Sequence, residues 1–162
     1  MKFSLSKLKK AFVTSQSKAN PQEQNFTDEL IKSIEQKPFA ISNDNVCYAS
    51  ANELAGYYYL QTVVVGKFRI KTFEGAQLKV LGTDVELNLE SDMMELESEL
   101  YNVPKSYMTR MDFILNENDL PKIDRPKIHT LILTAKKQNL EFSVIPSEEV
   151  EEETKPNTEQ PN

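Results

Sequence analysis

From Phe39 to Ile145 the chain alternates between apolar and polar residues with a period of two, interrupted mainly by turn-forming residues. Successive side chains of a strand point to opposite faces, so this alternation is typical of half-buried strands in an antiparallel sheet. We therefore predict a mainly β fold, an antiparallel β-sandwich or flattened barrel of about seven to nine strands, with one or two N-terminal helices. The alternative is an α+β fold in which one open antiparallel sheet packs on a helix.

The turns between residues 67 and 100 predict a meander of four strands. A three-residue loop at 73–75 with its glycine last, a Gly82-Thr83 turn and a turn at 91–94 would fix the register. The expected cross-strand neighbours are Phe68 with Val80, Val80 with Val85, Ile70 with Leu78, Leu78 with Leu87, Leu89 with Leu96, and Val85 with Leu100. Every apolar residue then lies on one face.

The opposite face of this meander would be acidic at one edge. The same registers bring together five glutamates, which are the candidate protein-binding face: Glu86, Glu90, Glu95, Glu97 and Glu99. Like charges on neighbouring strands repel, so this face needs solvent, a basic partner or a cation to be tolerated. A solvated face is the simplest interpretation, a partner surface the second and a bound divalent ion the third.

Residues 1–25 form a basic arm in front of the domain. At 100° per residue the apolar side chains of residues 2–14 gather on one side of a helix and the lysines on the other. The candidate membrane arm consists of Lys2, Leu5, Lys7, Leu8, Lys9, Lys10 and Phe12. This helix is expected to pack on the body or to be partly disordered; the alternative is contact with an anionic membrane surface or a partner groove. A weaker alternative is an organellar transit peptide.

A second helix is predicted over residues 28–36. Thr27 would be its N-cap, and Pro38 would stop it. Leu30, Ile31 and Ile34 form its apolar stripe. Downstream, one helical turn is expected at 50–55. A single long strand bent at Gly66 is expected at 57–72, and a central strand is expected from residue 128.

Charge and composition separate the ends of the chain from its body. The net charge is −6, yet residues 1–22 hold five lysines and no acid, whereas residues 147–162 hold six glutamates and one lysine. We predict one β-rich domain at 26–146 and a disordered acidic tail at 147–162. A mildly acidic body does not attract a nucleic-acid backbone, so nucleic-acid binding is disfavoured.

The single cysteine, Cys47, cannot form an internal disulfide and fits a reducing compartment. The N-terminal apolar stretch is too short for a signal-peptide core, and no apolar run approaches the length of a membrane span. We predict a cytoplasmic protein without a signal peptide or transmembrane segment.

Residues able to carry catalysis are few. The one histidine, His129, would begin a strand on the side of Leu131 and Leu133, as a histidine at the edge of the core. Acids at 117, 119 and 124 lack the spacing of a calcium loop, and Cys47 has no neighbour that would lower its pKa. With four glycines the chain has no phosphate-binding motif. We therefore assign no catalytic residue, no metal site and no cofactor.

These observations favour a non-enzymatic interaction or scaffold module that binds an unidentified protein partner through its sheet faces and charged arms. Tyr57, Tyr58 and Tyr59 would place aromatic rings on both faces of a strand, where exposed rings can anchor a partner. The alternative is a peripheral membrane adaptor that uses the basic N-terminal helix. A small-ligand carrier or enzyme with a site in a barrel mouth is a lesser alternative.

Overall fold

A computed structural model describes residues 21–34 and 36–146, and the side chains from Phe26 onward. The described helix is α2 (Pro21–Ser33). One large sheet contains β1 (Ala40–Ile41), β2 (Asn45–Leu54), β3 (Tyr57–Gly66), β5 (Gln77–Gly82), β6 (Val85–Glu90), β8 (Glu99–Leu100), β9 (Tyr107–Leu115), β10 (Ile128–Ala135) and β11 (Gln138–Val144). A small second sheet pairs β4 (Lys71–Thr72) with β7 (Leu96–Glu97), and two 3-10 helices, η1 (Glu117–Lys122) and η2 (Arg125–Lys127), precede β10.

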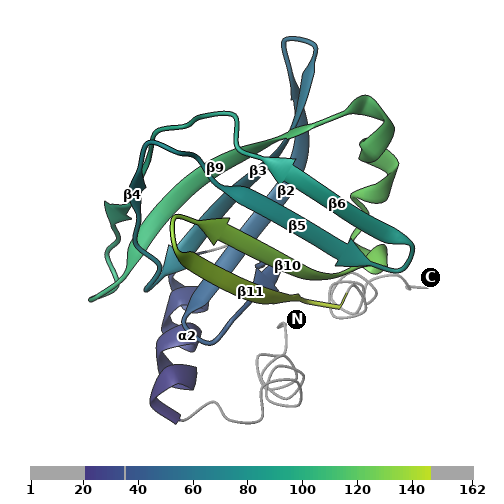
Figure 1. Cartoon of the computed structure of the whole chain (residues 1–162). Coiled ribbons are helices and arrows are strands. Elements are labelled where there is room, and N and C mark those ends of the chain that lie inside the picture. The colour runs from purple at the N-terminus through teal and green to yellow at the C-terminus, as the bar shows by residue number, and fades with distance from the viewer. Residues whose placement is uncertain (1–20, 35, 147–162) are drawn as a thin grey trace, which may run out of the picture.

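The large sheet is antiparallel, with the strand order β6-β5-β10-β11-β1-β2-β3-β9-β8. It curls so strongly that its two ends approach each other, as Figure 1 shows. Ser91, just after β6, forms a bridge with Phe113 of β9, and the Asp92 amide donates to the Asp112 carbonyl at 2.8 Å. The predicted mainly β fold of sandwich or flattened-barrel type is confirmed, and the sheet is not the open one of the alternative.

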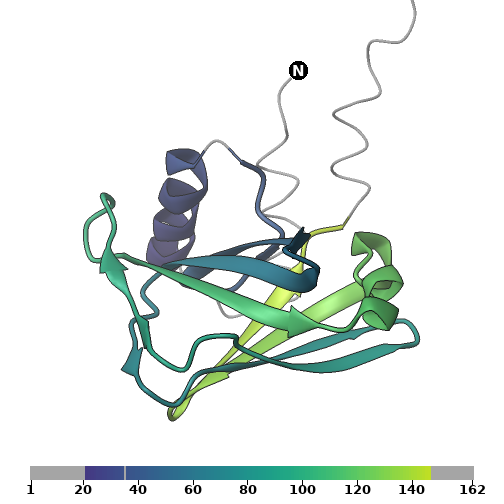
Figure 2. The same ribbon diagram turned by 90° about the horizontal axis from the view of Figure 1, so that it is seen from above.

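Two apolar clusters stabilise the fold, one on each face of the sheet. The inner cluster fills the curl, and its most deeply buried side chains include Phe113, Phe142, Leu131 and Leu133. The outer cluster lies where α2 covers the sheet, as Figure 2 shows from above. Its buried members are Leu30, Ile41, Val46, Tyr48, Val65, Val103 and Ile145. Burial of an apolar side chain contributes roughly 1.5–3 kcal/mol, so both clusters matter to stability.

Helix α2 begins earlier than the sequence indicates. It starts at Pro21 and ends at Ser33, so Thr27 lies inside the helix and the predicted N-cap is wrong. The buried Thr27 hydroxyl donates instead to the Asn43 carbonyl at 2.6 Å, which ties the helix to the loop between β1 and β2. Proline suits the first turn of a helix because the amide it lacks would have no partner there. The predicted stripe does face the sheet, with Leu30 fully buried.

The helical turn predicted at 50–55 is wrong, because β2 continues to Leu54 and pairs with β3 along its whole length. The connection is a two-residue turn in which Ala55 and Gly56 both have positive φ, 54° and 84°. This is the backbone requirement of a type I′ hairpin turn, which favours Asn-Gly and rarely contains alanine. Alanine at the first turn position hides this hairpin from sequence analysis.

Gly66 ends β3 instead of bending it. A Cβ at this position would collide with the Asp44 carbonyl and the Asn45 side chain. The chain then leaves the sheet, and the Phe68 amide donates to the Asn45 Oδ1 atom at 2.8 Å. The strand predicted over 57–72 is therefore two separate segments, and only Lys71–Thr72 is paired beyond Gly66.

The predicted meander registers are wrong, although their inward face is right for every apolar residue except Leu100. The β5–β6 turn lies at Thr83 and Asp84, where Asp84 has a φ of 58°, so Val80 lies opposite Leu87 instead of Val85. Gly82 remains in the strand opposite Val85, and only glycine fits there because the Lys127 carbonyl occupies the space of a Cβ. A slip of two residues keeps every side chain on its face, which explains why the apolar pattern does not reveal it.

The neighbours of the meander are also different from those predicted. Strand β5 pairs with β10, with Val80 opposite Leu131, so Phe68 is not its neighbour. Strand β8 pairs with β9, and Leu100, expected opposite Val85, is 82% exposed. As predicted, β10 is a central strand. Alternation determines which face a side chain takes, but it does not identify the adjacent strand.

Leu87 and Leu100 provide a matched test of this register, because the sequence predicts both to point inward. Leu87 is 7% exposed in the inner cluster and Leu100 is exposed. We expect Leu87→Ala to lower the free energy of unfolding by about 2–5 kcal/mol. Leu100→Ala should change it by less than about 0.5 kcal/mol, as for other surface substitutions. Denaturant titration measures both, and similar losses for the two variants would contradict the structure.

Candidate functional site

The five glutamates of the predicted acidic face are all exposed but do not form one face. Glu86 and Glu90 lie on β6, and Glu90 is opposite Gln77. Glu97 lies on β7 opposite Lys71, and Glu99 lies on β8 opposite Met108. Glu95 precedes β7 in a loop. The predicted register, which brings the five glutamates together on neighbouring strands, is therefore wrong, because β6 pairs with β5 and not with residues 95–100. A role of these glutamates in partner binding stays a prediction.

The candidate membrane arm lies outside the described residues, and so do residues 147–162. His129 is described and exposed, contrary to its expected place at the edge of the core. The register between β10 and β5 shifts between Ile128 and Thr130, which makes His129 the extra residue of a β-bulge. Its Nε2 atom lies 3.3 Å from the Thr83 hydroxyl.

Cys47 is 2% exposed and lies in the inner cluster. Burial raises the pKa of its thiol to about 12, so the thiol stays protonated near neutral pH. Among the acids at 117, 119 and 124, Asp119 pairs with Lys122 at 3.5 Å. Within the described part of the chain, no three His, Cys, Asp or Glu side chains gather closely enough to hold a metal ion.

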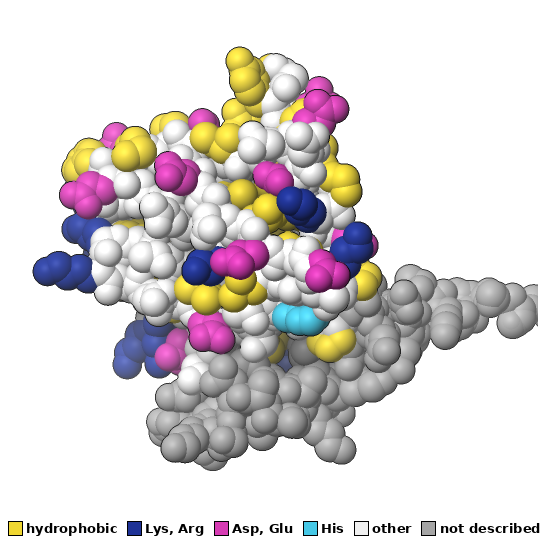
Figure 3. Space-filling model, turned by 45° about the vertical axis from the view of Figure 1, so that its right-hand side comes forward, with side chains coloured by type: hydrophobic (Ala, Val, Ile, Leu, Met, Phe, Trp, Pro, Cys, Tyr) yellow, Lys and Arg dark blue, Asp and Glu magenta, His cyan; other side chains and the backbone are white. Residues whose placement is uncertain are grey.

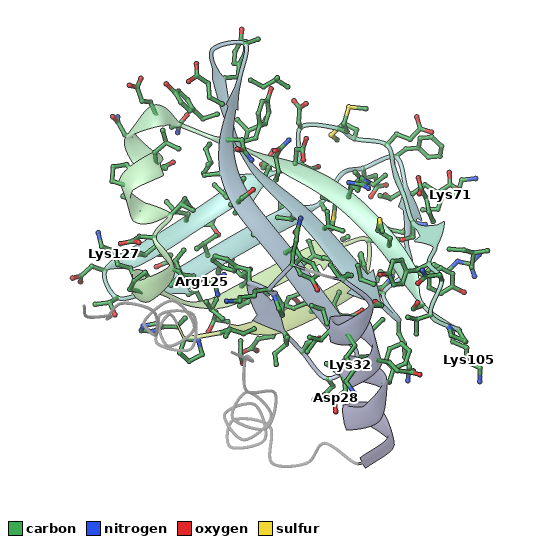
Figure 4. The ribbon with its side chains drawn as sticks, turned by 180° about the vertical axis from the view of Figure 1, so that it is seen from behind. Asp28, Lys32, Lys71, Lys105, Arg125 and Lys127 are labelled. Atoms are coloured by element: carbon green, nitrogen blue, oxygen red, sulfur yellow. The ribbon has the colours of Figure 1, made fainter. Side chains whose placement is uncertain are left out.

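A polar groove of about 410 Å³ lies on the outer face of β2, β3 and β9. We call it the outer groove. The chain that follows α2 and Arg125 both border it, and Arg125 contacts Phe39 of that chain. Figure 4 shows Arg125 beside the β2–β3 ribbon and α2 at the lower end of that ribbon. Its lining residues are Gln36, Lys37, Phe39, Tyr48, Ala49, Ser50, Gln61, Thr62, Val63, Arg110, Asp112 and Arg125.

Strand register sets the floor of the outer groove as two rows of side chains. One row runs from Tyr48 through Val63 to Arg110, and the next row runs from Ser50 through Gln61 to Asp112. All six side chains share the face opposite the inner cluster. Along β2 and β3 the row positions lie an even number of residues from the outer-cluster residues Val46 and Val65, and the register assigns the same face to their partners on β9. The rows bring an arginine and an aspartate of β9 together with the polar side chains of β2 and β3.

Arg125 is the best-anchored charge of the outer groove. Its guanidinium lies 4.6 Å from the centre of the Phe39 ring and donates to the Ile145 carbonyl at 3.2 Å. Partial burial lowers the pKa of Arg125, but arginine keeps its charge at any physiological pH. In the described part of the chain, neither Arg125 nor Arg110 forms an ion pair. Arg110 and Arg125 thus line the groove together with one acid, Asp112.

Tyr48 contributes a buried polar group to the floor of the groove. The residue is 8% exposed, and its hydroxyl has no hydrogen-bond partner among the described residues. Burial is the main cause that raises the pKa of this phenol above its ordinary value, with a smaller contribution from Tyr101, so the hydroxyl stays protonated. A buried polar group without a partner is destabilising.

The same outer face continues from the groove to the tip of the β2–β3 hairpin. Asn52, Tyr59 and Ile114 form the next row, and Leu54 pairs with Tyr57 beyond it. Leu54 is 64% and Tyr57 68% exposed. Hydrophobic side chains gather over this hairpin at the top of Figure 3. We call Asn52, Leu54, Tyr57, Tyr59 and Ile114 the aromatic tip.

The three tyrosines divide between the two faces, as expected for consecutive strand residues. Tyr58 packs against the inner cluster, whereas Tyr57 and Tyr59 lie on the outer face. Sequence analysis finds this tyrosine run but misses the outer groove. Lys37, Tyr48, Arg110 and Arg125 are far apart in the sequence, and only the strand order brings them together. The alternation of Arg110 and Asp112 is the one local signal, and it predicts a polar strand face without showing what lies beside it.

A second groove of about 390 Å³ crosses β5, β6, β10 and β11. It contains Lys79 and Glu90, so its two charges are of opposite sign, unlike the basic set of the outer groove. Figure 3 likewise shows both signs of charge interspersed over the face in view. This second groove is therefore the weaker candidate for a charged ligand.

Comparison with protein-family models, with curated proteins and with solved structures finds no match to this chain. No helix among the described residues has the length and apolar character required to span a membrane.

A pair of buried hydroxyls tests the description of Tyr48. Thr62 donates to the Met111 carbonyl at 2.7 Å, whereas the Tyr48 hydroxyl has no such acceptor within the described residues. We expect Thr62→Val to lower the free energy of unfolding by about 1 kcal/mol. Tyr48→Phe should leave it unchanged or raise it by up to about 1 kcal/mol, because the variant removes an unsatisfied group. A clear loss of stability in Tyr48→Phe, measured by denaturant titration, would show that this hydroxyl has a partner.

Proposed function

We propose that this chain is a protein-interaction module that binds an acidic, partly apolar segment of a partner protein along the outer face of β2, β3 and β9. The observation that carries the proposal is the charge of the outer groove. Arg110 and Arg125 line it together with a single acid, Asp112, and neither arginine is neutralised by an ion pair with a described residue.

The aromatic tip supports a partner that is longer than a single charged group. It lies on the same face, one row beyond Ser50 and Gln61. Exposed aromatic and large aliphatic side chains often supply the anchors of an interface, whereas charge complementarity guides association. A segment with carboxylates over the groove and apolar side chains at the tip fits both features.

The net charge of the chain is −6, which repels an acidic partner at a distance. At physiological ionic strength, however, charges farther apart than about 8 Å are largely screened. The local basic set of the outer groove therefore decides the contact. We place this interaction in the cytoplasm, because a single buried cysteine fits a reducing compartment.

The alternatives have less support from the described residues. The membrane adaptor rests on residues 2–14, which lie outside them. A ligand site inside the curled sheet has little room, because Phe113, Phe142 and Met111 fill the centre of the inner cluster. A partner surface on the outside of the sheet is the function that the described geometry favours.

Binding of two labelled peptides tests this proposal directly. One peptide carries a run of glutamates followed by Leu and Tyr, and the other carries glutamines in place of the glutamates. We expect the full-length protein to bind the acidic peptide more tightly, with an affinity that falls as salt is raised. Arg110→Glu should weaken binding by about tenfold or more, since it reverses a charge within the groove. Fluorescence anisotropy measures each affinity.

Lys79→Glu is the matched control, because it makes the same change of charge in the second groove. It should alter the affinity by less than about threefold. Equal weakening by the two variants would show that only net charge matters. Failure of the acidic peptide to bind better than the glutamine peptide would contradict the proposal.

A further inference from the structure

We propose that the chain's own acidic segment, residues 148–153, occupies the outer groove and competes there with partners. The segment reads Glu-Glu-Val-Glu-Glu-Glu, five carboxylates around one valine. This is the chemistry that the basic lining of the groove favours. The inference rests on the proposed function for its regulatory meaning, whereas the contact itself depends only on the groove and the segment.

The path of the chain brings Ile145, three residues before this segment, to the rim of the outer groove. The Ile145 amide donates to the Phe39 carbonyl at 2.9 Å, and the Ile145 carbonyl accepts from Arg125 at 3.2 Å. Phe39 and Arg125 are themselves lining residues of the groove. Two hydrogen bonds of Ile145 therefore hold the chain beside the groove directly after β11. Figure 4 shows Arg125 near the end of β11.

The reach of the segment matches the size of the groove. An extended chain advances about 3.3 Å per residue, so Glu148 to Glu153 lie within roughly 10–26 Å of Ile145. From β2 to β9 the groove crosses two strand spacings, about 10 Å in all. Several of the five carboxylates can thus lie near Arg125 and Arg110 without any change in the described domain.

Tethering strengthens such a contact even where each charge pair is weak. A short linker holds its two ends at an effective concentration in the millimolar range, far above that of most cellular partners. A partner must then displace the segment before it binds. The apparent affinity of the groove for a free acidic peptide is reduced by the fraction of molecules in which the segment occupies it.

Other binding sites for the acidic segment lie within the same chain. The basic arm, with five lysines in residues 1–22, is the main competitor. Its residues differ from those of the outer groove, which include Arg110 and Asp112 of β9. A measurement that reports position therefore distinguishes the two.

Paramagnetic relaxation provides that measurement on the full chain. A nitroxide at Thr154→Cys, in a Cys47→Ala background, should broaden the amide signals of Gln61, Arg110 and Asp112. We expect the broadening to disappear at high salt, in Arg110→Glu, and in a variant with glutamine at all five glutamate positions of 148–153. It should persist in Lys79→Glu. Broadening of residues 1–20 alone, or broadening of the groove that survives the five glutamine substitutions, would overturn the proposal.

Peptide binding separates this inference from the proposed function. The variant with five glutamines should bind the labelled acidic peptide at least about threefold more tightly than the unchanged chain. Equal affinities without broadening would overturn the competition by the segment and leave the partner proposal standing. Broadening in the unchanged chain, with no peptide binding by the glutamine variant, would support the contact and overturn the partner proposal.

Discussion

The fold depends on the position of β10 between β5 and β11. Along β10, Val80 of β5 lies opposite Leu131 on one side, and Phe142 of β11 lies opposite it on the other. The inward side chains Ile128, Leu131 and Leu133 are almost fully buried. The β10–β11 hairpin joins the β5–β6 hairpin to strands β1, β2, β3 and β9, so that both groups of strands form one curled sheet.

This arrangement also creates the outer groove. Because the last strand returns beside β1, Ile145 meets Phe39 and Arg125 at one end of the outer face. Helix α2 covers the neighbouring part of the same face over Val65 and Val46, and the chain that follows it supplies Lys37. The basic residues of the groove therefore come from three separate segments, and none of them would face another in a simple meander.

Sequence analysis predicts the faces of this fold better than its neighbours. Period-two alternation places Leu87 and Leu89 in the core correctly, because a strand position has only two faces. It fails at the Thr83–Asp84 turn, since a slip of two residues preserves every face. It also fails at His129, where a bulge inverts the pattern. Alternation within a strand gives no information on which distant strand lies beside it, so it does not predict the pairing of β5 with β10. Without that pairing the sequence does not predict the outer groove, whereas the tyrosine run of the aromatic tip is evident from consecutive residues.

Cross-strand NMR contacts at Val80 test the central claim that β10 lies beside β5. The structure predicts backbone nuclear Overhauser effects from Val80 to Leu131 on one side and to Leu87 on the other. The sequential meander predicts contacts from Val80 to Phe68 and to Val85. Observation of the first pair would support the curled sheet and the groove on its outer face. Observation of the second pair would contradict the strand order and remove the basis of the proposed binding surface.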